Sequence, residues 1–159
     1  MPLKSLNKII KYFLVWIILA FSAVKVKEFV LGLIANNHSK AIYNPFFSLY
    51  EVHNTGAAFS LFQDKTNILI LASVLCIIII TAVILAKTSK LTQTMVSAMA
   101  CLSAGMSVNT FERIEYGYVT DYLYLKFLKN FPVFNLPDVM IVIGAFMLVL
   151  AIASKPREL

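Results

Sequence analysis

The sequence predicts an all-α membrane protein: four transmembrane helices with a small outer-face β-like cradle and a short interfacial helix. Two observations carry this prediction. Of the 159 residues, 60% are hydrophobic and 14% are charged, with a mean hydropathy of +0.81, whereas soluble domains are about 45–50% apolar and about 25% charged. In addition, four apolar stretches approach the roughly 20 residues with which a helix crosses a bilayer. The length suits a single integral-membrane domain over residues 1–159.

The predicted spans are residues 10–33, 67–86, 91–109 and 137–154. The third span has the lowest hydropathy, but it contains the small residues that let helices approach closely in lipid: Ser97, Ala98, Ala100, Ala104 and Gly105. The first span has an alternative interpretation as a cleavable secretory signal, since lysines precede an apolar run and a small Ser22-Ala23 pair. Cleavage there would place the charged turn at Lys87 and Lys90 on the opposite side from the tail, which the positive-inside bias disfavours.

Positive charge on the short flanks predicts the orientation, because short cytoplasmic flanks are enriched in lysine and arginine. Basic residues precede the first span, occupy the turn between the second and third, and follow the fourth: Lys4, Lys8, Lys11, Lys87, Lys90, Lys155 and Arg157. Both termini are therefore expected on the cytoplasmic side. The two long connections, 35–66 and 110–136, are expected on the outer face, where the unusual polar residues gather.

The composition argues against several other classes of protein. The net charge of +6 does not indicate nucleic-acid binding, because half of it is the topological signal and no basic patch is interleaved with aromatic residues. The sequence has no glycine-rich phosphate loop and no His or Cys cluster with metal-ligand spacing. No metal, cofactor or nucleic-acid partner is therefore expected.

The first outer connection contains a strand-like stretch and a polar corner. Residues 41–52, AIYNPFFSLYEV, alternate loosely between aromatic and polar residues, which indicates short strands or an interfacial lip. Asn54, Thr55 and Gly56 follow. Gly56 permits a close backbone turn and Asn54 offers side-chain hydrogen bonds. The alternative is a tight strand turn without substrate contact.

The second outer connection predicts a short amphipathic helix. Thr120-Asp121 is a plausible N-cap, and the following YLYLKFLK places apolar residues along one side, with Lys126 and Lys129 able to snorkel. This pattern is typical of a helix lying on the membrane surface. Asp121 is then expected in its first turn, at the water boundary.

Asp138 opens the fourth predicted span directly after a proline, where a carboxylate meets the positive end of a helix dipole. One interpretation is helix capping alone. The other is functional, because a set of polar residues is expected at the outer mouth of the same bundle: Asn109, Arg113, Asp121, Asn135 and Asp138. Ionisable groups at such a boundary are functional candidates.

Two aspartates at one boundary have a well-defined chemistry. Like charges a few ångström apart cannot both ionise, so one carboxyl keeps its proton while the other takes a proton from water, which attacks a peptide carbonyl. This is aspartic-protease chemistry, and it uses neither a metal nor a nucleophilic side chain. Because the pair titrates as a unit, the acid and base roles are assigned to neither Asp121 nor Asp138.

These residues resemble the lipoprotein signal peptidase family, signal peptidase II. The resemblance rests on four blocks in order: NTGAAFS at 54–60, NTFER at 109–113 against N-x-x-D-R, GYVTD at 117–121 against G-x-V-x-D, and FNLPD at 134–138 against F-N-x-A-D. It implies an aspartic protease of the bacterial cytoplasmic (inner) membrane whose active site faces outward. Such an enzyme removes signal peptides from diacylglyceryl-modified prolipoproteins before the lipidated cysteine, with these lipidated substrates and membrane lipids as its partners.

Carried onto this chain, the resemblance makes Asp121 and Asp138 the catalytic pair. It makes Asn109, Arg113 and Asn135 the groups that position the aspartates or the substrate backbone. The stretch from Asn54 through Gly56 to Phe59 is similar to the lip of the cradle that holds the substrate, with Ala57, Ala58 and Phe59 as an apolar floor.

Four positions depart from the family pattern. Val108 stands where the family usually has glycine, Glu112 where it has aspartate, and Pro137 where it has alanine. In the first span, Ala23 replaces the aspartate of an Asp-x-x-x-Lys pattern, which leaves Lys25, Lys27 and Glu28 as the charged residues there.

These departures leave two functional hypotheses. A third, a small transporter, is disfavoured because the charged residues lie at the outer face and not at the middle of the bilayer. An active protease is favoured by the presence of both aspartates. The alternative is a catalytically impaired paralogue that binds lipopeptides, since loss of supporting residues commonly reduces activity without changing the fold.

Overall fold

The computed structural model describes residues 2–36, 46–57 and 61–154. In these residues the elements follow in the order α1 (Leu3–Asn36), β1 (Phe47–Asn54), α2 (Thr66–Lys87), the 3₁₀ helix η2 (Thr88–Lys90), α3 (Gln93–Tyr116), β2 (Val119–Leu125) and α4 (Leu136–Ala153). A helix coincides with each of the four predicted spans. The helix α3 continues past the predicted end at 109, because the polar residues there remain buried against the other elements.

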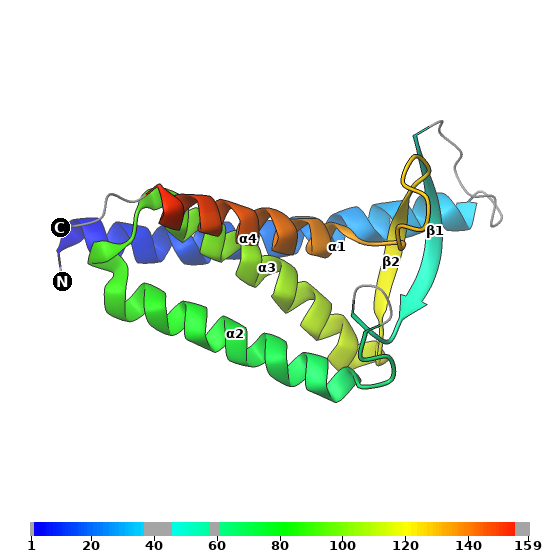
Figure 1. Ribbon diagram of the computed structural model, residues 1–159, viewed down its shortest axis with the longest axis horizontal. Helices are drawn as coiled ribbons and strands as arrows, with labels where there is room; N and C mark the ends of the chain where they lie inside the picture. The colour runs from blue at the N-terminus through cyan, green and yellow to red at the C-terminus, as the bar shows by residue number, and fades with distance from the viewer. Residues whose placement is uncertain (1, 37–45, 58–60, 155–159) are drawn as a thin grey trace.

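The helices run side by side, and the sheet crosses one end of the bundle (Figure 1). The start of α1, the end of α4 and the turn η2 lie together at the opposite end. At that end, Lys8 donates from its ammonium group to the carbonyls of Thr88 and Leu91, at 3.2 and 2.7 Å. The long connections therefore share one end of the bundle, and the short flanks share the other.

Within the described residues, α1, α2 and α4 are long and apolar enough to cross a membrane. The helix α3 is less apolar because it lies among the other helices and buries small and polar residues, among them Ala98, Ser103 and Asn109. Its crossing of the membrane remains a prediction. The helix α1 has 34 residues, about 51 Å at 1.5 Å per residue, so it is longer than the hydrocarbon layer and reaches the sheet.

Two kinds of contact hold α3 in the centre. The backbones of α3 and α4 approach so closely at Gly144 that a Cβ there would lie 2.6 Å from the Leu102 nitrogen, which fits the small-residue packing expected in lipid. Polar side chains tie the other helices together. The hydroxyl of Tyr12, which is fully buried, lies 3.0 Å from the hydroxyls of both Thr81 and Ser103 and so connects α1, α2 and α3.

The strands β1 and β2 form an antiparallel pair, with Phe47 opposite Leu125 and Asn54 opposite Val119, and an irregularity between Leu49 and Val52. The strand-like interpretation of 41–52 is confirmed for the part within β1. The backbone of Phe134 adds a short bridge to Leu123 on β2.

The predicted amphipathic helix after Thr120 is wrong, because residues 119–125 form β2. Gly117 ends α3 in the left-handed conformation, with φ of 82°, and the chain reverses into a strand. Val119, Tyr122 and Tyr124 are residue types that favour strands, and β1 supplies the hydrogen-bonding partner. Asp121 consequently lies in the middle of a strand and is 2% exposed, instead of lying in a helical turn at the water boundary.

Several predictions fall outside the described residues. They concern residues 41–45 of the strand-like stretch, Ala58 and Phe59 of the apolar floor, and Lys155 and Arg157 of the C-terminal flank.

Candidate active site

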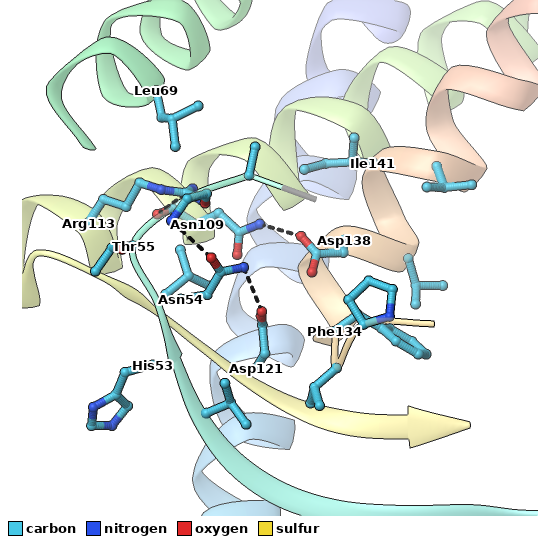
Figure 2. A pocket seen from close by; sticks show the side chains of 18 of the residues that line it. His53, Asn54, Thr55, Leu69, Asn109, Arg113, Asp121, Phe134, Asp138 and Ile141 are labelled. Carbon is cyan, nitrogen blue, oxygen red and sulfur yellow. Dashed lines mark hydrogen bonds between the residues drawn. The ribbon is translucent and has the colours of Figure 1, made fainter. Parts of the chain in front are cut away.

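Two carboxylates from different elements face one space at the sheet end of the bundle (Figure 2). Asp121 comes from β2, where its neighbours in the strand are buried. Asp138 comes from the first turn of α4. Pro137 lies in that turn, where its missing N–H is tolerated.

Asn135 joins the two aspartates. Its side-chain Nδ2 donates to Asp121 Oδ1 at 2.9 Å, and its backbone N–H donates to Asp138 Oδ2 at 3.2 Å. Asn135 is also the N-cap of α4, since its Oδ1 accepts from the Asp138 backbone N–H at 2.8 Å. Helix capping and the functional interpretation of Asp138 are therefore compatible, because the capping box itself fixes this carboxylate.

Asn109 completes the amide network from α3. Its Nδ2 donates to Asp138 Oδ1 at 2.8 Å, and its Oδ1 accepts from Asn135 Nδ2 at 3.1 Å. Asn109 and Asn135 are 5% and 1% exposed. Buried amides with their donors satisfied hold fixed orientations, so this network fixes the aspartates relative to one another.

The Asn54 corner closes the site from the side of β1. Asn54 Nδ2 donates to Asp121 Oδ2 at 2.9 Å, while Asn54 Oδ1 accepts from the Gly56 backbone N–H at 2.9 Å. A side chain at Gly56 would place its Cβ 2.9 Å from the Leu61 carbonyl oxygen. The corner therefore uses Gly56 for close backbone approach, as the sequence predicts, and uses Asn54 to contact an aspartate.

Arg113 links the corner to α3. Its guanidinium donates to the Gly56 carbonyl at 2.7 Å and to the Asn109 carbonyl at 3.5 Å. The structure thus brings together all seven site residues predicted from the sequence: Asn54, Gly56, Asn109, Arg113, Asp121, Asn135 and Asp138. Their roles in chemistry remain predictions.

Burial governs the charge of Asp121. Removal from water raises the pKa of the Asp121 carboxyl to about 7, the hydrogen bond from Asn54 opposes this rise, and the nearby Asp138 carboxylate adds to it. Near neutral pH this carboxyl therefore holds a proton for a large fraction of the time. A protonated carboxyl beside a second carboxylate is the arrangement from which one group donates a proton while the other accepts one.

A cavity of about 740 Å³ opens beside the two aspartates. Its polar wall includes Asn54, Asn109 and both aspartates. Its apolar wall comes from α2, α4 and the segment before α4, with Leu69, Val139, Val142 and Phe131 among its residues. The cavity therefore joins a polar corner to an apolar surface that belongs to two membrane-length helices. No group of three or more His, Cys, Asp or Glu in the described residues lies close enough together to hold a metal ion.

One contact next to the site did not follow from the sequence. Lys27 of α1 forms an ion pair with Glu112 of α3, with 2.9 Å between Nζ and Oε1. The available signal was a lysine inside an apolar helix, since a buried charge of this kind takes an opposite partner. The partner is 85 residues away in the sequence (112 less 27), which is why spacing along the chain does not reveal it.

Comparison with known proteins points to one family. The profile described as "Signal peptidase (SPase) II" matches residues 9–154. A lipoprotein signal peptidase of Dehalococcoides mccartyi is 42% identical over 108 residues, which are 66% of this chain and 66% of the relative. One from Clostridium novyi is 32% identical over 134 residues, covering 82% of this chain and 89% of the relative. A solved structure, described as a bacterial membrane enzyme structure obtained by the in meso method at 2.3 Å resolution, shares the fold, with a TM-score of 0.75 over 94% of each chain at 20% identity.

Proposed function

The chain belongs to the signal peptidase II family, and from that premise we propose that it is an aspartic endopeptidase of the membrane. It cleaves the signal peptide from diacylglyceryl-modified prolipoproteins, directly before the lipidated cysteine. The observation that carries the proposal is the amide network in which Asn135 donates to both Asp121 and Asp138. This network holds two carboxyls at one cavity.

In the proposed reaction, Asp121 and Asp138 share one proton. The ionised carboxyl takes a proton from a water molecule, and that water attacks the carbonyl carbon of the scissile peptide bond. The protonated carboxyl donates to the carbonyl oxygen, where negative charge develops. Collapse of the tetrahedral intermediate returns a proton to the leaving nitrogen. Because the pair titrates as a unit, we assign the role of acid and the role of base to neither aspartate individually.

The cavity suits a substrate that is part peptide and part lipid. The polar corner with Asn54 and Gly56 offers hydrogen-bonding groups to the peptide backbone at the cleavage site. The apolar wall from α2 and α4 suits acyl chains or a signal peptide that spans the bilayer. In the proposed orientation, both termini are cytoplasmic and the sheet end faces outward, which agrees with the lysines on the short flanks.

Cleavage of a diacylglyceryl-modified prolipoprotein by the purified protein, followed by gel shift, tests the proposal. We expect Asp121→Asn and Asp138→Asn each to lower the rate by more than about 1000-fold, because each removes a group that must carry or accept the proton. Asp64→Asn is the matched control. Asp64 lies between β1 and α2, is exposed, and accepts a hydrogen bond from the Thr55 hydroxyl at 3.1 Å.

Activity retained by either dyad variant would overturn the proposed chemistry. Binding of the lipidated precursor without cleavage by the unmodified protein would favour the alternative, a catalytically impaired paralogue that binds lipopeptides. Asparagine has nearly the size of aspartate, but it has one acceptor oxygen where both oxygens of each aspartate accept hydrogen bonds. Unchanged melting temperatures of the variants would therefore assign their loss of activity to the chemistry.

A further inference from the structure

The carboxylate of Glu112 connects three elements on the side of β2 that faces α1. Its Oε1 lies 2.9 Å from Lys27 Nζ on α1, and its Oε2 accepts the backbone N–H of Thr120 on β2 at 2.8 Å. The two charged side chains are 17% and 4% exposed. The ammonium group also lies 5.7 Å from the centre of the Tyr116 ring.

Thr120 directly precedes Asp121 in the chain. The hydrogen bond to the Thr120 N–H fixes the Val119–Thr120 peptide unit, one residue before Asp121, and so restricts the direction from which the Asp121 carboxyl enters the site. The opposite edge of β2 pairs with β1, where Asn54 supplies the bond to Asp121. The strand that carries Asp121 is therefore held by β1, by Glu112 at Thr120 before the aspartate, and by the backbone of Phe134 at Tyr122 and Leu123 after it.

The ion pair makes this attachment possible. A buried carboxylate without a partner is costly, and at position 112 it would add negative charge beside Asp121 and Asp138. The charged groups around it are Arg113 on its own helix, the two aspartates, and Lys27 with Glu28 on α1. Lys27 is the group in direct contact with the Glu112 carboxylate, at 2.9 Å, and so it is the partner that compensates this carboxylate next to the site.

We propose that Lys27 and Glu112 are a positioning pair for the reaction: Lys27 stabilises the Glu112 carboxylate, and that carboxylate holds β2 so that Asp121 faces Asp138. This inference rests on the proposed function. Neither residue contacts the cavity beside the aspartates, and we assign neither of them contact with the substrate.

The test compares variants that remove the charge with one that removes the hydrogen-bond acceptor. Glu112→Met keeps the length of the side chain but cannot accept the Thr120 N–H, and we expect kcat to fall about 100-fold with little change in KM. Glu112→Gln keeps an acceptor for the Thr120 N–H, so its kcat should fall much less than that of Glu112→Met. Lys27→Met leaves a buried carboxylate unpaired, so its kcat should fall further than that of the double variant Lys27→Met/Glu112→Gln, in which neither side chain carries a charge.

The matched control is Lys25→Met. Lys25 forms an ion pair with Glu28 at 2.7 Å on the same helix, but both side chains are 55% exposed, so kcat should remain unchanged. Amide hydrogen exchange gives a readout independent of cleavage: Glu112→Met should speed exchange at Thr120 and leave the protection of α3 and α4 intact.

Two results would overturn the inference. One is a Glu112→Met variant with kcat and Thr120 exchange like those of the unmodified protein. The other is loss of protection throughout α3 and α4 in that variant, which would assign Glu112 to folding alone. If the unmodified protein does not cleave the lipidated precursor, the proposed function fails, while the exchange measurement still decides whether Glu112 holds β2.

Discussion

At the scale of single residues, the geometry of this site depends on how one asparagine is placed. Asn135 caps α4, donates to Asp121 from its side chain and donates to Asp138 from its backbone. A serine at this position would retain the capping function, because serine is also a favoured N-cap residue. Its shorter side chain would not reach Asp121.

Asn135→Ser should therefore separate catalysis from stability. We expect cleavage to fall about 10- to 100-fold, since Asp121 loses a fixed donor. The melting temperature should fall less than in Asn135→Ala, which also loses the cap at a cost of about 1 kcal/mol. Parallel assays of cleavage and thermal unfolding in detergent check this. Equal loss of stability in the two variants, with activity unchanged in the serine variant, would contradict the bridging role.

The raised pKa of Asp121 predicts how stability changes with pH. The folded-state pKa is about 7, compared with an ordinary value of 3.8, so between these values the folded protein binds more protons than the unfolded one. The stability that this group contributes is complete below the ordinary pKa and is lost as pH rises through about 7. Activity should decline over the same upper range, because the pair then loses its shared proton.

Melting temperatures from about pH 5 to about pH 8.5 check this prediction. The unmodified protein should become less stable towards the alkaline end, and Asp121→Asn should show a flatter profile because its amide does not titrate. A profile for Asp121→Asn as steep as that of the unmodified protein would assign the pH dependence to another group.

At the scale of elements, alanine substitutions at two helical glycines are expected to have different effects on stability. Gly144→Ala on α4 should destabilise the protein by about 1–3 kcal/mol. The new Cβ would lie 2.6 Å from the Leu102 nitrogen and 2.9 Å from the Ala98 carbonyl oxygen, and these backbone atoms cannot move aside as a flexible side chain could. Gly32→Ala on α1 is the matched control. Among the described residues, no atom outside the adjoining backbone of α1 lies within 4 Å of its Cβ position, so the higher helix propensity of alanine should leave stability equal or slightly higher. Thermal unfolding of the two variants compares them directly, and equal effects would show that α3 and α4 tolerate wider spacing.

The departures from the family pattern also have an explanation at this scale. Ala23 and Val108 belong to one buried apolar cluster with Ala104 and Met140, so the missing aspartate of the first span and the missing glycine of α3 lie together. Their replacement by apolar residues leaves no buried charge unpaired at that point. Glu112, which replaces an aspartate, reaches Lys27 and Thr120.

At the scale of the whole molecule, the sheet lies across one end of the helices (Figure 1). The apolar wall of the cavity includes residues of α2 and α4, so under the proposed function we expect a substrate held in the bilayer to meet the aspartates along those helices. Binding energy from lipid chains that lie away from the scissile bond can then be used to position that bond.

An unlipidated precursor should therefore be a poor substrate, with a lower kcat/KM than the diacylglyceryl-modified form of the same sequence. Cleavage of the two precursors in the same lipid preparation measures the difference. Equal turnover of both forms would exclude a contribution from the lipid chains.

The sequence by itself predicted the four long helices and named the polar residues that the structure brings together at one cavity. Apolar runs of membrane length are local properties of the chain, and so is the spacing of the four motif blocks. The residues Asn54, Asn109, Asp121, Asn135 and Asp138 could therefore be named before their contacts were known.

The tertiary structure decided three other features: that residues 119–125 form a strand, that Asn135 joins the two aspartates, and that Lys27 pairs with Glu112. A short apolar run is ambiguous between helix and strand until a partner strand is present, and β1 lies more than sixty residues earlier in the chain. Ion pairs and side-chain hydrogen bonds between distant segments depend on helix packing. The pattern of residues along the chain therefore identified the groups of the site, and the packing of α1, α3, α4 and the sheet determined their geometry.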